Sequence, residues 1–405
     1  MCFDIVIVGG GLSGLALASE LAHPDFSHLK VLVLEQRSRY VRDRTWSYWK
    51  TATSLPHAFS HLERQAWRRW QVGVGDRIFQ RPVTADIGKG NTTTRSSYCT
   101  LDGDAFYGAA LNTIAQSSHV ELRLGTPVQR ICGGDGPIVE TMNGDVVRGT
   151  WVFDARPPTH SHKDGLVQQF AGYEIRTEND VFDTTTVELM HFQPSNEGLH
   201  FFYVLPYTPR TALIETTWIC PASHQPDFES ELRNYISALL RAATSKPFEI
   251  LYVEKGVLSL SGIAPKRAKY VVPLGRAAGT LRASTGYAFL ETLVHARQVA
   301  VSLKGLSGAG NLRHWTPPTF NRPALDLWMD EVFLSVLSRD WAKGPEYFMQ
   351  MFERVEADTL VAFLSGQANL KERLLVAAAL PARPFAKQAL STLLRQKQIS
   401  AGTPP

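Results

Sequence analysis

Three glycines and one acid near the N-terminus have the types and the spacing that bind an adenine dinucleotide. Gly9, Gly11 and Gly14 form a G-x-G-x-x-G pattern. Glu35 follows about 20 residues later, where a carboxylate can hold ribose hydroxyl groups. The first glycine permits a tight turn, the second lets the backbone approach a pyrophosphate, and the third lets helix and strand pack closely. These residues predict a dinucleotide-binding site.

The segments around the glycines have the order that such a site needs. Residues 3–8 are apolar and predict a strand, and residues 15–21 predict a helix. Residues 31–34 predict a second strand, which ends at Glu35. The helix would direct its positive N-terminal end and its free N–H groups toward the phosphates. Because the glycine pattern lies between a strand and a helix, it is specific enough to predict nucleotide binding.

The composition indicates a folded protein of more than one domain. The chain has 405 residues, of which 44% are hydrophobic and 20% are charged, and this length is too great for one layered core. The net charge of +4 is too small to indicate a nucleic-acid partner. The four cysteines form no C-x-x-C pair and the 12 histidines have no metal-ligand spacing. The sequence therefore predicts no metal site and a reducing compartment.

The same reasoning bears on where the protein resides. The first strand begins within three residues of Met1, which leaves no room for a signal peptide. No apolar run approaches the roughly 20 residues that a membrane-spanning helix needs. The sequence therefore predicts a cytoplasmic protein that at most lies on the cytoplasmic face of a membrane.

The middle of the chain interrupts the nucleotide-binding pattern with sheet-like segments. An aromatic and basic stretch over 44–95 has strand-like alternation, which predicts an inserted sheet or a lid. Residues 167–257 alternate more strongly and predict an antiparallel sheet, interrupted by one helix over 228–243. Asp102 can cap a helix over 103–115. Shorter strands are predicted over 98–101, 120–124, 128–131, 138–142 and 151–154.

The last third of the chain returns to the nucleotide-binding pattern and then becomes helical. A strand and a glycine turn over 270–279 precede a helix that begins near Gly286, and residues from 322 onward have helical periodicity. The predicted fold class is therefore α/β, with a Rossmann-like domain, an inserted antiparallel β-sheet substrate domain and a helical C-terminal region. The predicted boundaries are 1–60, 96–157 and 268–310 for the nucleotide-binding domain, 61–95 and 158–267 for the substrate domain, and 311–405 for the helical region.

Five short motifs and the C-terminal tail, taken in order, resemble a known family. The segments are similar to the glutathione-reductase-type FAD-binding domain, in the group that includes aromatic hydroxylases, geranylgeranyl reductases and lycopene cyclases. More narrowly, the chain resembles the flavoprotein-type lycopene cyclases of bacteria nearly from end to end. Besides the glycine loop, the matching segments are Arg44-Thr45-Trp46-Ser47-Tyr48, Val152-Phe153-Asp154-Ala155-Arg156, Phe202-Tyr203-Val204-Leu205-Pro206, Leu213-Ile214-Glu215-Thr216-Thr217, Ser284-Thr285-Gly286-Tyr287, 348–364 and 369–380.

The resemblance implies FAD as the cofactor, active in its reduced form, with NAD(P)H as the electron donor. By this likeness the glycine loop lines the pyrophosphate, Glu35 binds the adenosine ribose, and Asp154 ends a strand beneath the cofactor. Backbone N–H groups beside the flavin would stabilise an anionic reduced ring. The cofactor-binding residues that the resemblance implies are Gly9, Gly11, Leu12, Ser13, Gly14, Glu35, Gln36, Arg44, Asp154, Gly275, Ala278, Gly279, Thr285 and Gly286.

The resemblance also implies a reaction, which is ring closure at the end of a hydrophobic linear polyene, by default lycopene. Glu215 matches the family's catalytic glutamate. Burial in an apolar chamber would raise its pKa, so that it could protonate a terminal alkene near neutral pH. Trp46, Tyr48 and Tyr287 are the candidates for cation–π contact with the carbocation. The reaction is redox-neutral overall, and the reduced flavin would stabilise the positive charge.

Three residues depart from the family pattern. Thr216 stands where the family often has a second acid, which leaves the final proton acceptor unassigned. Arg282 stands where the family commonly has His-Pro, and it would add charge near the flavin or the pocket mouth. Arg276 replaces an Asp that normally bonds the ribityl chain. Glu188 and Glu254 are further candidates for proton transfer, although strand glutamates are more often structural.

These departures leave two alternatives open. The first is a family sibling that cyclises another alkene-bearing natural product, because the changes at positions 216 and 282 would suit a different substrate. The second is a redox flavoenzyme, either a monooxygenase or a polyprenyl reductase. A hydroxylase would normally carry the Asp that is missing at position 276, so this residue disfavours it.

Two segments have the composition of a membrane-facing surface. Trp67-Arg68-Arg69-Trp70 combines residue types that suit the interface. The apolar run 374–380 is flanked by the basic residues Lys371, Arg373, Arg383 and Lys387. An ordinary protein surface explains the first segment equally well, and packing on the substrate domain explains the second. The sequence therefore leaves peripheral membrane association open.

Overall fold

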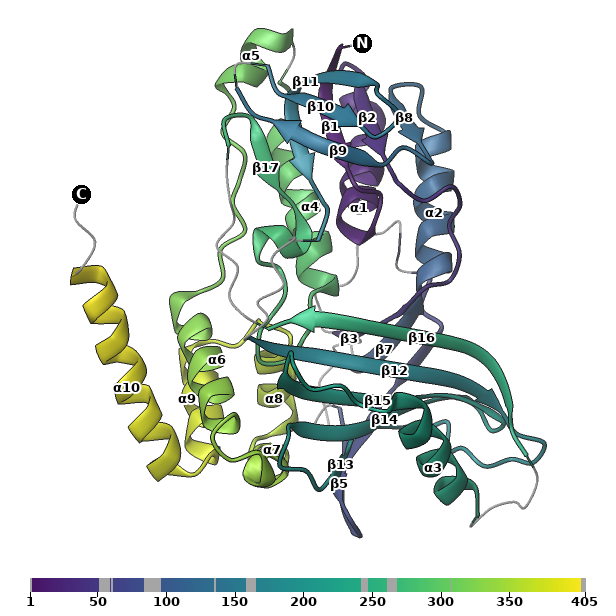
Figure 1. The fold of residues 1–405 in the computed structure, drawn as a ribbon, viewed down its shortest axis with the longest axis vertical. Helices are drawn as coiled ribbons and strands as arrows, with labels where there is room; N and C mark the ends of the chain where they lie inside the picture. The colour runs from purple at the N-terminus through teal and green to yellow at the C-terminus, as the bar shows by residue number, and fades with distance from the viewer. Residues whose placement is uncertain are drawn as a thin grey trace, which may run out of the picture.

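The computed structural model of the chain describes residues 2–50, 59, 61–83, 96–134, 136–157, 165–241, 247–260, 268–306 and 308–401. A helix-covered sheet forms its upper part, and a second sheet with a group of C-terminal helices beside it forms the lower part (Figure 1). Parts of the predicted domains lie outside the described residues, at 51–58, 60, 84–95, 158–164 and 261–267.

The first sheet has seven strands and a parallel centre. β1 pairs in parallel with β2 and β11, so Val8, Leu34 and Asp154 lie side by side where the strands end. All of β2 and the second half of β1 are buried apolar residues, as in parallel sheets covered by helices. The strands are, in spatial order, β8 (Val120–Arg123), β2 (Val31–Leu34), β1 (Cys2–Val8), β11 (Val146–Asp154), β10 (Ile138–Thr141) and β9 (Val128–Cys132), with β17 (Val271–Pro273) also paired to β11.

Three helices pack together against the first sheet. α1 (Leu12–Leu21) begins directly after the glycine loop and contacts both α2 (Gly103–Ala115) and α4 (Phe289–Leu303). Their apolar side chains form one core with those of β1, and Leu17 and Leu293 are buried in it. The nucleotide-binding half is therefore completed by a helix that lies far away in the sequence.

The second sheet also has seven strands, and all its pairs but one are antiparallel. The exception is β5, which runs parallel to β13 and brings in the segment after residue 68. α3 (Phe228–Arg241) covers one face of this sheet through buried Leu232 and Ile236. The strands are, in spatial order, β16 (Glu249–Ser259), β12 (Leu166–Arg176), β15 (Thr211–Pro221), β14 (Leu199–Thr208), β13 (Thr186–Gln193), β5 (Arg69–Val74) and β6 (Arg77–Pro82).

A three-stranded sheet and a helical tail complete the described structure. The small sheet has the order β3 (Thr45–Lys50), β7 (Ser97–Asp102) and β4 (Gln65–Trp67), and β7 leads directly into α2. None of the helices in the described ranges is long and apolar enough to cross a membrane. The tail helices are α5 (Gly308–His314), α6 (Ala324–Leu337), α7 (Gly344–Arg354), α8 (Ala357–Leu364), α9 (Leu370–Ala379) and α10 (Ala382–Ala401), with α10 outermost in Figure 1. Short 3-10 turns within the described ranges include η1 (Pro24–Phe26), η3 (Gly275–Ala278) and η4 (Trp341–Lys343).

The prediction that Asp102 caps a helix is wrong in its detail. Asp102 precedes α2 as expected, but its side chain makes no cap hydrogen bond. Its carboxylate instead pairs with Arg42 at 3.1 Å and with Arg64 at 3.0 Å. The same two arginines bind Glu174 of β12 at 2.7 and 2.5 Å. The two guanidinium groups engage the carboxylate in place of a cap bond, and they tie the start of α2 to the second sheet.

The start of α4 also differs from the prediction. The helix begins at Phe289 and not near Gly286. Gly286 has a φ of 72°, in the left-handed region that favours glycine and does not continue an α-helix. A Cβ at this position would clash with the side-chain amide of Gln168 on β12. The loop before α4 therefore remains irregular and lies against the second sheet.

Candidate active site

The glycine loop has the geometry of a phosphate cradle. Gly9 has a φ of 99°, which turns the chain sharply after β1. A Cβ at Gly14 would clash with the carbonyl oxygen of Gly9, so only glycine lets α1 lie this close to the turn. A Cβ at Gly11 would meet nothing within 4 Å, so the backbone there faces open space. Leu12 and Ser13 open α1 beside that space.

Glu35 is held rigidly at the end of β2. It is 3% exposed, and its carboxylate accepts hydrogen bonds from the backbone N–H of Gly10 at 2.6 Å and of Arg37 at 2.8 Å. These bonds orient the acid beside the glycine loop, as the sequence predicts for a ribose-binding residue. Gln36 is exposed. Asp154, at the end of β11, binds the Arg156 guanidinium through two bonds of 2.8 Å.

A second glycine segment approaches the first from the end of β17. Gly275 has a φ of 62°, and a Cβ there would meet the Ser13 side chain at 2.6 Å, so the two segments are in close contact. Ala278 ends η3, and Gly279 follows with a φ of 90°. Thr285 accepts a hydrogen bond from the backbone N–H of Tyr287 at 3.3 Å.

Two arginines lie close together beside these segments. Burial and the nearby Arg44 lower the pKa of Arg276. The Nε of Arg276 is buried without a hydrogen-bond partner in the described structure. Arg44 itself bonds to Asp43 at 2.9 and 3.2 Å. Two like charges with an unused donor favour an anion between them, such as a diphosphate.

Glu215 lies on β15, on the face of the second sheet that turns away from α3. Its carboxylate accepts a hydrogen bond from Thr217 Oγ1 at 2.8 Å. Burial raises its pKa well above the ordinary value of a glutamate, and the nearby Glu254 raises it further. A carboxyl group in this state holds a proton near neutral pH and can act as a general acid.

Glu254 of β16 is the residue whose place the sequence did not predict. It is 4% exposed and accepts a hydrogen bond from Thr45 Oγ1 at 3.0 Å. Burial raises its pKa to about 7. The strand pattern shows that it is a strand glutamate, but not which strand lies beside its own. Glu188, the other candidate for proton transfer, instead faces α3 and accepts a hydrogen bond from Tyr235.

The change at Thr216 does not remove an acid from the Glu215 face. Successive strand residues point to opposite faces, and Thr216 points toward α3. There it lies 2.9 Å from His200 Nε2 and donates to Glu231 at 2.6 Å. An acid at position 216 would therefore lie on the α3 face of the sheet and not beside Glu215.

The predicted aromatic residues divide between two places. Tyr287 lies 3.3 Å from the hydroxyl of Tyr98, which also contacts the hydroxyl of Tyr203, the residue paired with Glu215 on β14. Tyr287 is therefore linked to the Glu215 group. Trp46 is not, because it packs against Phe289 and the aromatic residues of α2 in the core of the first sheet.

The reason for the placement of Trp46 is the alternation of β3. Thr45 contacts Glu254 and Ser47 contacts Tyr203, so Trp46 and Tyr48 point the other way. Tyr48 donates to Glu63 at 2.8 Å. Trp46 therefore lies in the core of the first sheet, whereas Tyr48 lines the same small cavity as Tyr287, and Trp49 packs against Tyr98. The roles of these rings toward a carbocation stay predictions.

The family model described as lycopene cyclase protein matches residues 4–390 of the chain. The chain belongs to the lycopene cyclase family. It is 25% identical to the lycopene beta-cyclase of Paracoccus sp. (strain N81106 / MBIC 01143), over 95% of this chain and 96% of that protein. It is 22% identical to the chloroplastic lycopene beta cyclase of Nicotiana tabacum, over 73% of this chain and 59% of that protein. The protein is an enzyme of the lycopene cyclase type.

Solved structures show the same fold at low identity. A geranylgeranyl bacteriochlorophyll reductase-like protein from Thermoplasma acidophilum matches with a TM-score of 0.60 and 14% identity, over 95% of this chain and 98% of that one. The flavin-dependent monooxygenase PieE, solved with FAD and substrate, matches with a TM-score of 0.60 and 13% identity, over 94% of this chain and 71% of that one. The predicted class, a Rossmann-like flavoprotein fold with an inserted sheet, is confirmed.

Arg282, which differs from the lycopene cyclase pattern, does not carry a free charge into the site. It is 2% exposed and pairs with Asp330 of α6 at 3.3 Å. It also donates to the Phe363 carbonyl. The charge is therefore paired within the packing of the tail, although Arg282 also lines the small cavity beside Tyr287. Its effect on the substrate stays a prediction.

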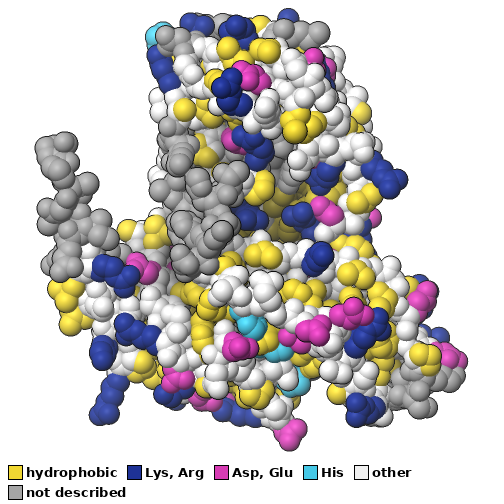
Figure 2. Space-filling model, viewed as in Figure 1, with side chains coloured by type: hydrophobic (Ala, Val, Ile, Leu, Met, Phe, Trp, Pro, Cys, Tyr) yellow, Lys and Arg dark blue, Asp and Glu magenta, His cyan; other side chains and the backbone are white. Residues whose placement is uncertain are grey.

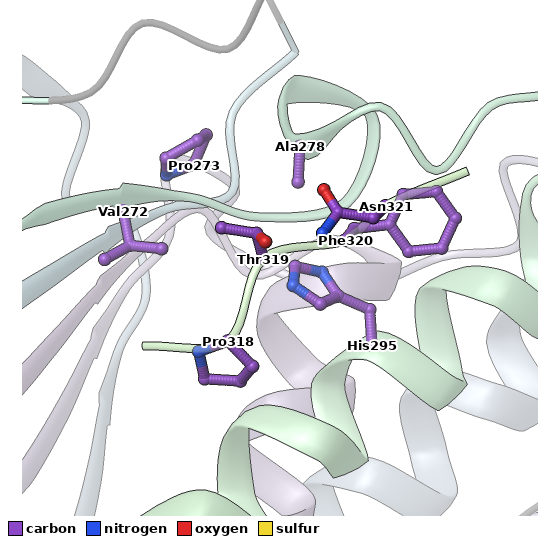
Figure 3. A pocket seen from close by; sticks show the side chains of 8 residues that line it. All are labelled: Val272, Pro273, Ala278, His295, Pro318, Thr319, Phe320 and Asn321. Carbon is purple, nitrogen blue, oxygen red and sulfur yellow. The ribbon is translucent and has the colours of Figure 1, made fainter. Parts of the chain in front are cut away.

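A cavity lies beside the second glycine segment, and a smaller one lies between β3 and the loop before α4. One of about 220 Å³ is bounded by the end of β17, by Ala278 and by residues 318–321, and His295 of α4 points toward it (Figure 3). The other, of about 30 Å³, lies beside Tyr287 and Ser47. Within the described ranges, no group of three or more His, Cys, Asp or Glu side chains gathers as a metal site.

Proposed function

We propose that this protein closes a ring at the end of a linear polyene, by default lycopene, in a net redox-neutral reaction with reduced FAD bound. The observation that carries the proposal is the state of Glu215. Its side chain is partly buried, its carboxyl group accepts a hydrogen bond from Thr217, and removal from solvent raises its pKa well above the usual range. Protonation of an isolated alkene needs such an acid in a place that excludes water.

The residues present fit FAD. Gly11 faces open space beside the N-terminus of α1, where a pyrophosphate can bind N–H groups. Glu35 is oriented for a ribose, and Arg44 and Arg276 would hold the phosphates. When bound, reduced FAD would supply negative charge beside a developing carbocation. We propose NAD(P)H as the source of its electrons.

The protein's own residues would act in a simple order. Glu215 gives its proton to the terminal alkene, and the cation that forms is attacked by the neighbouring double bond of the same substrate. Thr217 holds the carboxyl in place throughout. The tyrosine group of Tyr203, Tyr98 and Tyr287 lies next to Glu215 and offers electron-rich rings to the cation. A ring proton is then lost, and the substrate is neutral again.

The proposal is tested by producing the protein in bacterial cells that accumulate lycopene and separating the pigments by chromatography. Conversion to a carotene with one or two rings supports it. If lycopene is unchanged although the purified protein contains FAD, the substrate is wrong and other alkene-bearing natural products become the candidates. If product forms with stoichiometric consumption of NAD(P)H, the enzyme is a monooxygenase or a polyprenyl reductase.

Removal of the two arginines near the glycine segments is expected to weaken FAD binding. A hydrogen bond to a charged group contributes about 1.5–3 kcal/mol, so Arg276→Ala and Arg44→Ala should each raise the Kd for FAD about tenfold to a hundredfold. Titration of the apoprotein with FAD, followed by flavin fluorescence, measures this. Arg130→Ala is the control, because Arg130 is exposed and pairs with Glu140. Unchanged affinity in both variants would contradict the assignment.

We also propose that the outer surface of α9 and α10 lies on a membrane, from which a hydrophobic substrate would be drawn. α10 packs on α6 and leaves leucines of both helices exposed, together with Arg383 and Lys387. Hydrophobic and basic side chains gather in this region in Figure 2. This combination suits the interface of an anionic bilayer. The exposed leucines are Leu370, Leu374, Leu375, Leu390, Leu393 and Leu394.

Substitution of the α10 leucines is expected to release the protein from vesicles. A buried leucine contributes about 1.5–3 kcal/mol, so the triple variant Leu390→Gln, Leu393→Gln and Leu394→Gln should lower partitioning to anionic vesicles at least a hundredfold. Co-sedimentation measures the bound fraction. The control replaces Val253 and Val257, exposed on β16, with Gln. Equal loss in the control and the triple variant would argue against a specific membrane face.

A further inference from the structure

A second carboxyl group lies beside Glu215 because a glycine separates the two. Gly172 of β12 pairs with Glu215 of β15 on one side and with Glu254 of β16 on the other. A Cβ at Gly172 would lie 3.5 Å from Glu215 Cβ and 3.4 Å from Glu254 Cγ. With no side chain between them, two glutamates on strands that are not neighbours come within hydrogen-bonding reach of each other.

Each carboxyl group of this pair is held by one threonine. Thr217 donates to Glu215 Oε1 at 2.8 Å, and Thr45 donates to Glu254 Oε2 at 3.0 Å. Thr45 belongs to β3 of the small sheet, so the pair is fixed from two different sheets. Tyr252 of β16 also bonds to Glu254, and the remaining lone pairs of the two carboxyl groups can share a hydrogen bond between them.

The groups around the pair do not neutralise two negative charges. Arg42 is the cation that acts on Glu254, but it is already paired with Asp102 at 3.1 Å and with Glu174 at 2.7 Å. The other titratable groups that face the pair are the tyrosines Tyr252 of β16 and Tyr203 and Tyr207 of β14, together with Asp102 itself. Because Arg42 is already paired with other carboxylates, two adjacent negative charges at Glu215 and Glu254 are unfavourable, and the pair tends to keep one proton.

We propose that Glu215 and Glu254 share a single proton across Gly172, and that Glu254 is the positioning residue that keeps Glu215 protonated and restores its proton after ring closure. This inference rests on the proposed function for its chemical role. It also provides the second carboxyl that position 216 lacks. The sharing itself is a property of the protein without substrate.

The proton balance of the cycle closes with this pair. The O–H bond of Glu215 breaks and a C–H bond forms at the alkene, which leaves two carboxylates opposite one cationic substrate. When the ring forms, a C–H bond of the cation breaks and its proton returns to the pair as a new O–H bond. No electrons are gained or lost, and the pair again holds one proton.

The perturbed acidities agree with this geometry. Burial is the largest cause of the raised pKa of both glutamates, and the negative charge of Glu254 raises the pKa of Glu215 further. The pKa of Glu254 is raised to about 7. A pair of this kind titrates as a unit, so the loss of its shared proton should set the alkaline limit of activity.

The first test is the pH profile of Glu254→Gln. Because glutamine carries no charge, the pKa of Glu215 should fall, and the alkaline limb of kcat should move at least one pH unit lower. kcat at neutral pH should fall about tenfold or more while KM changes little. Glu188→Gln, on the other face of the same sheet, should leave the profile in place. A loss of activity without any shift would mean that Glu254 is only structural.

The second test uses the protein without substrate and separates this inference from the proposed function. The native pair keeps a proton at a pH where unfolded glutamates have lost it, so the free energy of unfolding should decrease as the pH rises from about 4.5 to 7. This slope should be smaller in Glu254→Gln. If the wild type shows this slope but does not convert lycopene, the shared proton is supported and lycopene is the wrong substrate. If the free energy of unfolding depends on pH equally in the wild type and in Glu254→Gln, the proposal of a shared proton is wrong.

Discussion

Replacement of Glu215 by glutamine is expected to abolish ring closure while the protein stays folded and keeps its flavin. General acid catalysis contributes about 10²- to 10⁴-fold to a rate, and protonation of an isolated alkene needs a positioned proton donor, which is the role proposed for Glu215. Glutamine has nearly the same size and can still accept the Thr217 hydrogen bond. It has no acidic proton. The loss should therefore lie in kcat and not in folding.

The measurement is the carotenoid composition of lycopene-accumulating cells, with flavin content and thermal unfolding of the purified variant. Glu188→Gln is the matched control, because Glu188 lies in the same sheet and its pKa is also raised by burial, but it faces α3. Replacement of the carboxyl should leave stability equal or higher near neutral pH, because glutamine is neutral in this place without holding a proton that an unfolded glutamate would lose. A fully active Glu215→Gln protein would show that the acid lies elsewhere.

The nucleotide-binding half could be predicted because its signals are local. Gly9, Gly14 and Glu35 lie within one strand–helix–strand unit, so their spacing in sequence determines their spacing in space. The tight packing at Gly14 and the orientation of Glu35 follow from that unit alone. The roles of these residues toward FAD remain predictions.

The carboxyl pair could not be predicted because it depends on strand order. Glu215 and Glu254 lie on β15 and β16, which are consecutive strands in sequence but are separated in space by β12. Only this insertion makes Gly172 the shared neighbour. Alternation within one strand cannot reveal which strand lies beside it.

The direction of the β3 side chains was undetermined for a similar reason. Alternation shows that Trp46 and Tyr48 share one face and that Thr45 and Ser47 share the other. It does not show which face meets the second sheet. Both faces of β3 are covered, so polarity does not show that Trp46 packs in the core of the first sheet while Thr45 reaches Glu254.

Substitution of Arg282 alone is expected to destabilise the fold strongly. Arg282 and Asp330 are 2% and 3% exposed, and Ser284 also donates to Asp330 at 2.6 Å. Arg282→Met would leave the Asp330 charge buried without its cation, which costs about 3–5 kcal/mol. Chemical denaturation measures this loss. Lys343→Ala, which removes an exposed pair with Asp340, is the control and should change stability little.

The double variant Arg282→Met, Asp330→Leu distinguishes a charge effect from a packing effect. A buried ion pair can be replaced by apolar residues of similar volume with little loss of stability, and sometimes with a gain of about 1–4 kcal/mol. We therefore expect the double variant to recover most of the stability that Arg282→Met loses. If the two losses simply add, the contacts of Arg282 with Phe363 and its ring are what stabilise the tail. In either case the FAD content should follow stability, because this pair lies in the junction between the loop before α4 and α6, away from the glycine loop.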